Sequence, residues 1–126
     1  MKLIDTCIWI EFTSNTATGQ TYDSLLREPS KLMVSTMVVY ELRKWLARHM
    51  EPEAADELMA AILTAHVVEP TSTIALQAAE LSKTYKLHAL DALIYATALE
   101  HDAELVTCDA HFEGLPSVNY TAKIAA

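Results

Sequence analysis

Short apolar runs alternate with longer amphipathic segments along the whole chain. The apolar runs are Leu3-Ile4, Met33-Val34-Ser35, Val67-Val68 and Leu105-Val106-Thr107. Because these runs are apolar on both faces, they are typical of strands buried within a parallel sheet. The pattern therefore predicts a central, mainly parallel sheet made of short strands.

The segments between these runs carry apolar residues at helical spacing. Helices are expected over about 17–27, 37–49, 52–65, 74–85 and 91–101. Strands that alternate with helices indicate α/β layers, so the predicted fold class is α/β, a three-layer α/β/α sandwich. A length of 126 residues supports one sizeable core, and residues 1–126 are expected to form a single domain.

Composition argues against several classes of protein. The sequence has no apolar run of about 20 residues and carries Asp5 where a signal peptide would stay apolar, so no membrane span is expected and cytoplasmic residence is the default. Cys7 and Cys108 are too few for a disulfide framework and are expected to fill the core. The net charge of −8 is the opposite of the basic footprint that nucleic-acid binding favours.

Two acids follow predicted strands. Asp5 ends the run Leu3-Ile4, and Asp109 lies just after Leu105-Val106-Thr107. Open parallel sheets bind ligands beyond the carboxyl ends of their strands, which is where these two acids are expected. Two alternatives stay open: Asp5 could only cap a short helix through Trp9, and Asp109 alone could be an ordinary loop residue.

Two more acids lie on predicted helices. Asp91 lies near the start of a segment, 90–99, that is otherwise nearly uncharged, so its helix should be buried and its carboxylate should need a cation or hydrogen bonds. A helix N-cap is the alternative for Asp91. Glu41 borders the apolar stripe of its helix, and its alternative is a solvated ion pair with Lys44.

As a set, these four acids predict a site for hard divalent cations. Mg²⁺ and Mn²⁺ prefer carboxylate and water oxygens, and clustered acids repel one another until a cation neutralises them. Such ions activate water and orient a phosphodiester without any protein nucleophile. A metal-loaded acidic patch also reconciles the negative net charge with phosphate binding. The five histidines are scattered, lack the spacing of a metal pair and are not expected to be catalytic.

Four segments together resemble the motifs of the PIN-domain family, in matching order. They are Leu3-Ile4-Asp5-Thr6, residues 34–42 with Glu41-Leu42, residues 91–98 from Asp91-Ala92-Leu93, and residues 106–112 with Cys108-Asp109-Ala110-His111. More closely, the chain is similar to the VapC toxins of type II toxin-antitoxin pairs. Two departures from many relatives are Cys108 in place of a basic residue and His101-Asp102-Ala103 in place of a glycine turn.

The resemblance implies a Mg²⁺- or Mn²⁺-dependent endoribonuclease that cleaves structured RNA, tRNA or rRNA. Its acidic positions correspond to Asp5, Glu41, Asp91 and Asp109, and its supporting hydroxyls to Thr6, Ser35 and Thr107. It further implies a homodimer and an inhibitory VapB-like antitoxin whose tail enters the active-site groove.

Other functions remain open on the sequence. The PIN-like chain could be an RNA-maturation nuclease or a non-catalytic binding module. A receiver-type phospho-signalling domain is also acidic and α/β, but it would have an acidic pair after the first strand, where this chain has Asp5 alone. Five cations could contact the RNA backbone near the acids, yet cations on helices are usually solvated, so no binding role is assigned to them. They are Arg43, Lys44, Arg48, Lys83 and Lys86.

Overall fold

A five-stranded parallel sheet forms the centre of the computed structural model, which describes residues 1–125. The strands are β1 (Lys2–Ile4), β2 (Met33–Ser35), β3 (His66–Val68), β4 (Glu104–Thr107) and β5 (Val118–Tyr120), in the order β3-β2-β1-β4-β5. Every neighbouring pair is parallel. The predicted α/β class with a parallel sheet is therefore confirmed.

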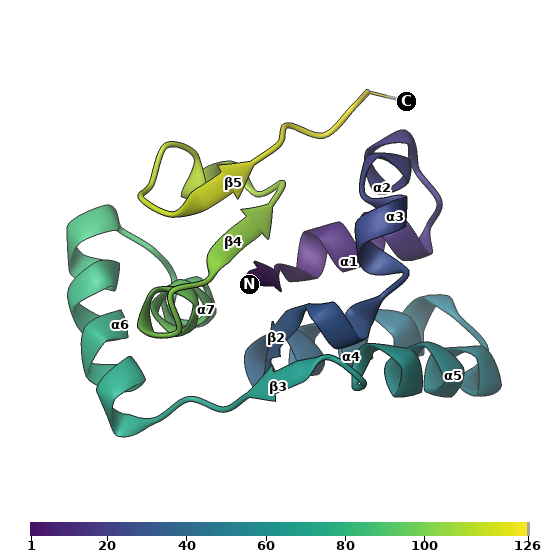
Figure 1. The fold of residues 1–126 in the computed structure, drawn as a ribbon, viewed down its shortest axis with the longest axis horizontal. Coiled ribbons are helices and arrows are strands. Elements are labelled where there is room, and N and C mark those ends of the chain that lie inside the picture. The colour runs from purple at the N-terminus through teal and green to yellow at the C-terminus, as the bar shows by residue number, and fades with distance from the viewer. Residues whose placement is uncertain (126) are drawn as a thin grey trace.

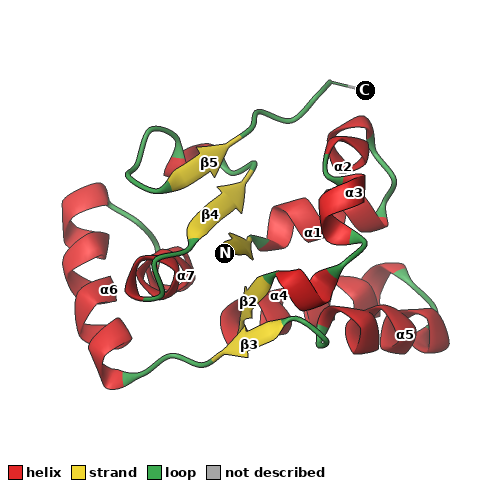
Figure 2. Ribbon diagram, viewed as in Figure 1, coloured by secondary structure: helices red, strands yellow, loops and turns green. Residues whose placement is uncertain are grey.

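Helices cover both sides of the strands (Figures 1 and 2). They are α1 (Thr6–Thr13), α2 (Ala17–Thr21), α3 (Asp23–Leu26), α4 (Thr36–His49), α5 (Pro52–Ile62), α6 (Ser72–Tyr85) and α7 (Ala89–Glu100), with 3-10 turns η1 (Pro29–Lys31) and η2 (Ala110–Phe112). In Figure 1, α6 and α7 lie together on one side, whereas α1 to α5 gather on the other. This arrangement is the expected sandwich.

The sheet order separates this fold from a receiver domain. In a receiver-type sheet the first strand lies between the second and the third. Here β1 lies between β2 and β4, because the chain returns to the far side of β1 only after α7. The receiver alternative is therefore wrong.

Burial follows the apolar pattern in the central strands but not in β3, an edge strand whose Val67 was expected to be buried and is 42% exposed. Leu3, Ile4, Leu105 and Val106 are fully buried in the two central strands, as expected for strands covered on both faces. The helix α7 is buried along residues Ala92 to Ala98 apart from Leu93, which is only partly exposed. Among the described residues, no helix is long and apolar enough to cross a membrane.

Two further local features differ from what the sequence predicts. The helix expected over residues 17–27 is broken at Tyr22, whose φ and ψ of −103° and 7° end α2 and begin α3. The strand β5 was not predicted, because Val118-Asn119-Tyr120 is an edge strand with one exposed central residue rather than an apolar run. Edge strands bury fewer side chains and so leave a weaker hydrophobic signal.

Register in the sheet decides where the first acid lies. Leu3 pairs with Leu105 and Ile4 with Val106, so β1 and β4 end side by side. The amide of Asp5 continues this pairing by donating to the Val106 carbonyl at 2.9 Å. The residues that follow both strands therefore meet at the carboxyl edge of the sheet.

Candidate functional site

Asp5 is held rigidly at the junction of β1 and α1. Its Oδ1 accepts a hydrogen bond from the Thr6 amide at 2.8 Å, so Asp5 is the N-cap of α1. Its Oδ2 accepts from the Thr107 hydroxyl at 2.7 Å, and only 5% of the residue is exposed. The alternative that Asp5 caps a helix is therefore correct. The cap fixes the carboxylate at the sheet edge, and it does not prevent the carboxylate from binding a further ligand.

Glu41 reaches the same edge from α4. The Thr6 hydroxyl donates to Glu41 Oε1 at 2.8 Å, which ties the glutamate to the residue next to Asp5. Within residues 1–125, Glu41 forms no ion pair with Lys44, so that alternative is wrong. Lys44 Nζ instead lies 5.1 Å from the centroid of the Tyr40 ring.

The three supporting hydroxyls do different things. The hydroxyls of Thr6 and Thr107 bond directly to Glu41 and Asp5. The fully buried Ser35 instead accepts from the Val38 amide at 3.2 Å and caps α4. Ser35 therefore supports the site only by fixing the start of the helix that carries Glu41.

Asp109 joins the cluster through the Thr107 hydroxyl. The Asp109 amide donates to Thr107 Oγ1 at 3.0 Å, and the same hydroxyl donates to Asp5. Asp109 Oδ1 in turn accepts from the His111 amide at 2.9 Å, which caps η2. One hydroxyl therefore positions two acids that are far apart in sequence.

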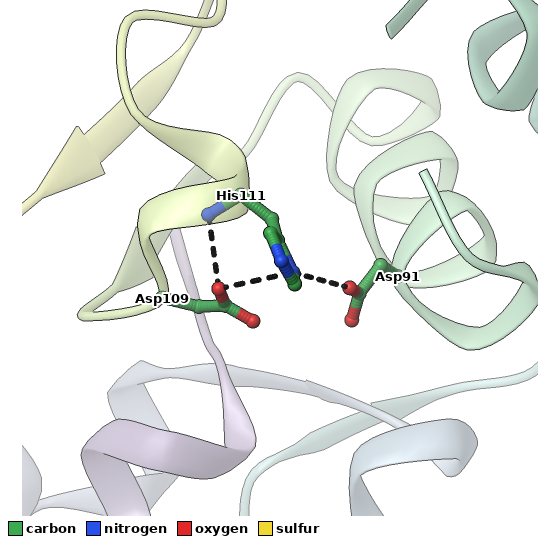
Figure 3. Close-up of side chains that lie close together, drawn as sticks. All are labelled: Asp91, Asp109 and His111. Atoms are coloured by element: carbon green, nitrogen blue, oxygen red, sulfur yellow. Dashed lines mark hydrogen bonds and ion pairs between the residues drawn. The ribbon is translucent and has the colours of Figure 1, made fainter. Parts of the chain in front are cut away.

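Asp91 completes the set from the first turn of α7. The N-cap of this helix is His88, so the capping alternative for Asp91 is wrong. Its side chain is 20% exposed, and His111 Nδ1 lies 3.7 Å from its Oδ2 and 3.3 Å from Asp109 Oδ1. Figure 3 shows the imidazole between the two carboxylates. The structure thus brings all four predicted acids to one edge.

His111 belongs to the site, although the sequence did not predict it as a site residue. One ligand atom from each of Asp91, Asp109 and His111 lies within 4.8 Å of the others. No fixed spacing between histidines marks this residue, since its partners come from a helix and a strand end. The available signal was its position two residues after Asp109.

Burial and mutual repulsion oppose negative charge at this edge. Burial raises the pKa of Asp5 to about 6, the hydrogen bonds from Thr107 and Thr6 partly offset it, and the charges of Asp91 and Glu41 add to it. The pKa of Asp91 is also raised, first by burial and then by Asp109 and Glu41. The pKa values of Asp5 and Asp91 are therefore each raised by the charges of two other acids of the set.

These donors fit a hard divalent cation. Carboxylate oxygens dominate the cluster, and the half-buried Asp91 and Asp109 point toward a common point with His111. A buried carboxylate with a raised pKa is stabilised in its charged form by a nearby cation. Imidazole nitrogen is a softer ligand that Mn²⁺ accepts more readily than Mg²⁺.

The two cysteines meet beside the acids. The Cys108 amide donates to Cys7 Sγ at 3.2 Å, and Cys7 Sγ lies 3.5 Å from the Thr107 hydroxyl oxygen. Both are free thiols, Cys108 being buried and Cys7 partly buried. Both pack against the hydrophobic core, and both line a cavity of about 420 Å³ that also reaches Asp109. Their expected filling role fits this packing.

Comparison with known proteins identifies the family. The PIN domain matches residues 2–117. Among solved structures, the chain is similar to a toxin-antitoxin complex from Klebsiella pneumoniae at 26% identity and a TM-score of 0.84, covering 98% of this chain and 100% of that one. No curated protein matches.

Two further structures share the fold at lower identity. VapBC2 from Rickettsia felis, bound to a promoter DNA fragment, has 16% identity and a TM-score of 0.72, with 96% of this chain and 97% of that chain covered. The sarcin-ricin loop cleaving toxin VapC20 from Mycobacterium tuberculosis has 22% identity and a TM-score of 0.67, with 82% and 85% covered. With a family match over nearly the whole length and an acid-bearing parallel sheet of this order, the chain belongs to the PIN-domain family.

Proposed function

We propose that this protein is a Mg²⁺- or Mn²⁺-dependent endoribonuclease that acts as the toxin of a toxin-antitoxin pair. The observation that carries the proposal is the convergence of Asp5, Glu41, Asp91 and Asp109 at the carboxyl edge of the sheet. The hydroxyls of Thr6 and Thr107 bond to Glu41, Asp5 and the Asp109 amide, and Asp91 reaches the same edge from α7. Helix capping alone does not require this arrangement.

In this proposal the four acids have different roles. Asp91 and Asp109, with His111, would hold a cation at the open part of the cluster, where their ligand atoms lie within 4.8 Å of one another. Asp5 would complete the site from beneath, its orientation fixed by Thr6 and Thr107. Glu41, fixed by Thr6, would orient a water molecule or accept its proton.

A bound divalent cation supplies Lewis-acid activation of water and charge stabilisation on the phosphate. The chain itself contributes the rest. The hydroxyls of Thr6 and Thr107 hold the carboxylates in fixed orientations, so little reorganisation is needed when substrate binds. The rings of His88 and His111, whose centroids lie 6.0 Å apart, are both close enough to Asp91 for their positive charge to oppose the rise of its pKa.

The substrate and partner belong to the same proposal. We infer that structured RNA, tRNA or rRNA, is cleaved, in keeping with the RNA-loop cleavage named for the Mycobacterium tuberculosis relative. A VapB-like antitoxin is inferred from the toxin-antitoxin complexes among similar structures. A homodimer, a single domain over residues 1–126 and cytoplasmic residence complete the proposal.

The test is cleavage of RNA by the purified, antitoxin-free protein. Total RNA would be incubated with EDTA, Mg²⁺ or Mn²⁺, and the cut ends mapped by sequencing. We expect discrete cuts that need metal and vanish in Asp91→Asn, whose neutral amide keeps the shape of the side chain. The matched control is Asp102→Asn, because Asp102 is exposed and lies outside the cluster.

Two results would overturn the proposal. Metal-loaded protein that leaves all RNA intact would favour a binding module, and cuts that persist in Asp91→Asn would place the chemistry elsewhere. Processing of one precursor RNA to a mature end, without toxicity on expression, would support a maturation nuclease instead.

A further inference from the structure

A groove of about 360 Å³ opens next to the acids along one face of α4. We call it the α4 groove, and its α4 residues are Tyr40, Glu41, Lys44, Trp45, Arg48 and His49. Residues three, four, seven and eight apart lie on one face of a helix, so Glu41, Lys44, Trp45 and Arg48 form a continuous stripe. Thr6 belongs both to this groove and to the acidic cluster, since it donates to Glu41.

Cations gather in the groove although the protein carries a net charge of −8. Both Lys44 and Arg48 are exposed, and neither forms an ion pair within residues 1–125. Their neighbour Arg43 points the other way and pairs with Asp56 on α5 at 2.9 Å. Two unpaired cations beside an acidic cluster are suited to a polyanion that reaches the cluster.

Aromatic rings accompany these cations. Tyr40 is 54% exposed, and Lys44 Nζ lies 5.1 Å from the centroid of its ring. The rings of Trp45 and His49 stack at 4.2 Å with an interplanar angle of 15°. Exposed flat rings next to cations are the combination with which proteins bind unpaired bases and their phosphates.

The geometry points to the α4 groove as a subsite for single-stranded RNA next to the scissile phosphate, an inference that rests on the proposed function. Tyr40 stacks on an unpaired base, and Lys44 and Arg48 bind the phosphates that follow it. A base within a duplex offers no free face to Tyr40, so the groove selects an RNA loop or another unpaired segment. A helical protein segment fits less well, because helix-binding grooves are mainly aliphatic and lack a row of free cations.

The test measures RNA affinity separately from cleavage. All variants carry Asp91→Asn to prevent cleavage, and a short labelled single-stranded oligoribonucleotide is titrated in Mg²⁺ at several salt concentrations. We expect Tyr40→Ala to weaken binding by about 5- to 150-fold with an unchanged salt slope, because one stacked base is lost. The double variant Lys44→Gln/Arg48→Gln should reduce the slope of log K against log salt by about 1.4, since each phosphate contact contributes about 0.7.

Matched controls separate a specific contact from a loss of fold or charge. Arg43→Gln removes the same charge one position away and should leave the salt slope unchanged, because Arg43 faces Asp56. Tyr40→Phe keeps the ring and should retain the affinity. A duplex of the same sequence should bind more weakly than the single strand and should be insensitive to Tyr40→Ala.

The outcomes distinguish this inference from the proposed function. If the protein with native Asp91 never cleaves RNA but the groove variants still lose RNA affinity, the subsite stands and the nuclease proposal falls. If cleavage is seen and neither the affinity nor the salt slope responds to the groove variants, the subsite is overturned alone. It is also overturned if these variants dissociate a homodimer by sedimentation while RNA affinity is unchanged, because the groove then binds a second copy of the chain.

Discussion

Asp5 combines two demands that oppose each other. Its carboxylate must be ionised to hold a cation, yet burial raises its pKa to about 6 and the neighbouring acids add to that shift. The hydrogen bonds from Thr6 and Thr107 fix its orientation but only partly offset the burial. In metal-free protein at neutral pH, an ionised Asp5 therefore destabilises the fold.

Asp5→Asn should stabilise the metal-free protein at neutral pH. Because the folded pKa of about 6 exceeds the ordinary value of 3.8, the folded state binds more protons between these values, and the Asp5 contribution to the free energy of unfolding falls as pH rises through this window. The full shift corresponds to about 3 kcal/mol, part of which is offset by weaker hydrogen bonding of the amide. We expect a gain of about 1–3 kcal/mol at pH 7 in urea unfolding with EDTA.

The pH profile gives this prediction its control. The difference between wild type and Asp5→Asn should shrink as pH falls from about 6 to 3.8, because wild-type Asp5 is protonated in the folded state below its pKa of about 6. The exposed Asp102→Asn should show no comparable gain. A variant that is less stable than wild type at pH 7 would contradict the idea that burial and repulsion dominate at Asp5.

At the level of single residues, the sequence predicted the acids better than their surroundings. Asp91 was recognisable because a carboxylate in an uncharged helix needs a partner. The partner His111 was missed, since only the fold places η2 beside the first turn of α7. Ser35 was predicted as a site hydroxyl, but its bond to the Val38 amide makes it a helix cap in the structure.

The helix α4 depends on that cap. Ser35 is fully buried and accepts from the Val38 amide, so Ser35→Ala leaves a buried donor unsatisfied at the helix start. We expect the loss of about 1 kcal/mol in urea unfolding, with metal affinity nearly unchanged because the hydroxyl touches none of the acids. Thr71→Ala, which removes the similar cap of α6 from the Ile74 amide, is the matched control. A large loss of metal affinity only in Ser35→Ala would restore a direct role for its hydroxyl.

At Gly19 in α2, close packing and helix propensity predict opposite effects of a substitution on stability. On helix propensity alone, Gly19→Ala should stabilise α2 by about 1 kcal/mol. In the structure, a Cβ at this position would lie 2.1 Å from the Glu11 carbonyl oxygen, where α2 crosses α1. Backbone atoms at that distance must move apart, so we expect a loss of about 2 kcal/mol or more in urea unfolding.

The sign of the Gly19→Ala effect decides the matter. A gain in stability would mean that α1 and α2 do not pack as closely as the structure shows. The control is Gly114→Ala, because a Cβ there meets nothing within 4 Å and any loss reflects only its φ of 80°. The expected helix over 17–27 is divided at Tyr22, where α2 ends and whose hydroxyl bonds to Thr121.

At the scale of the whole molecule, the layer architecture followed from alternating strands and helices, but the sheet order did not. The apolar runs do not predict that β4 pairs with β1, or that β5 pairs with β4 at the edge of the sheet. That order matters for the site, because the pairing of Ile4 with Val106 brings Asp5 and Thr107 together. Long-range pairing is set by the packing of all the layers, which local patterns do not encode.

The net charge of −8 and the acidic cluster together predict how the whole molecule responds to metal. A cation that binds only the folded state stabilises it by about 2.7 kcal/mol at a hundredfold excess over its Kd. Here the gain should be larger at pH 7.5 than at pH 5, because protons compete for Asp5 and Asp91, whose pKa values are raised. Thermal unfolding with Mg²⁺ or Mn²⁺ against EDTA measures this difference. Asp91→Asn should lose most of the gain, whereas an equal gain in that variant would mean that metal stabilises the fold through general charge screening.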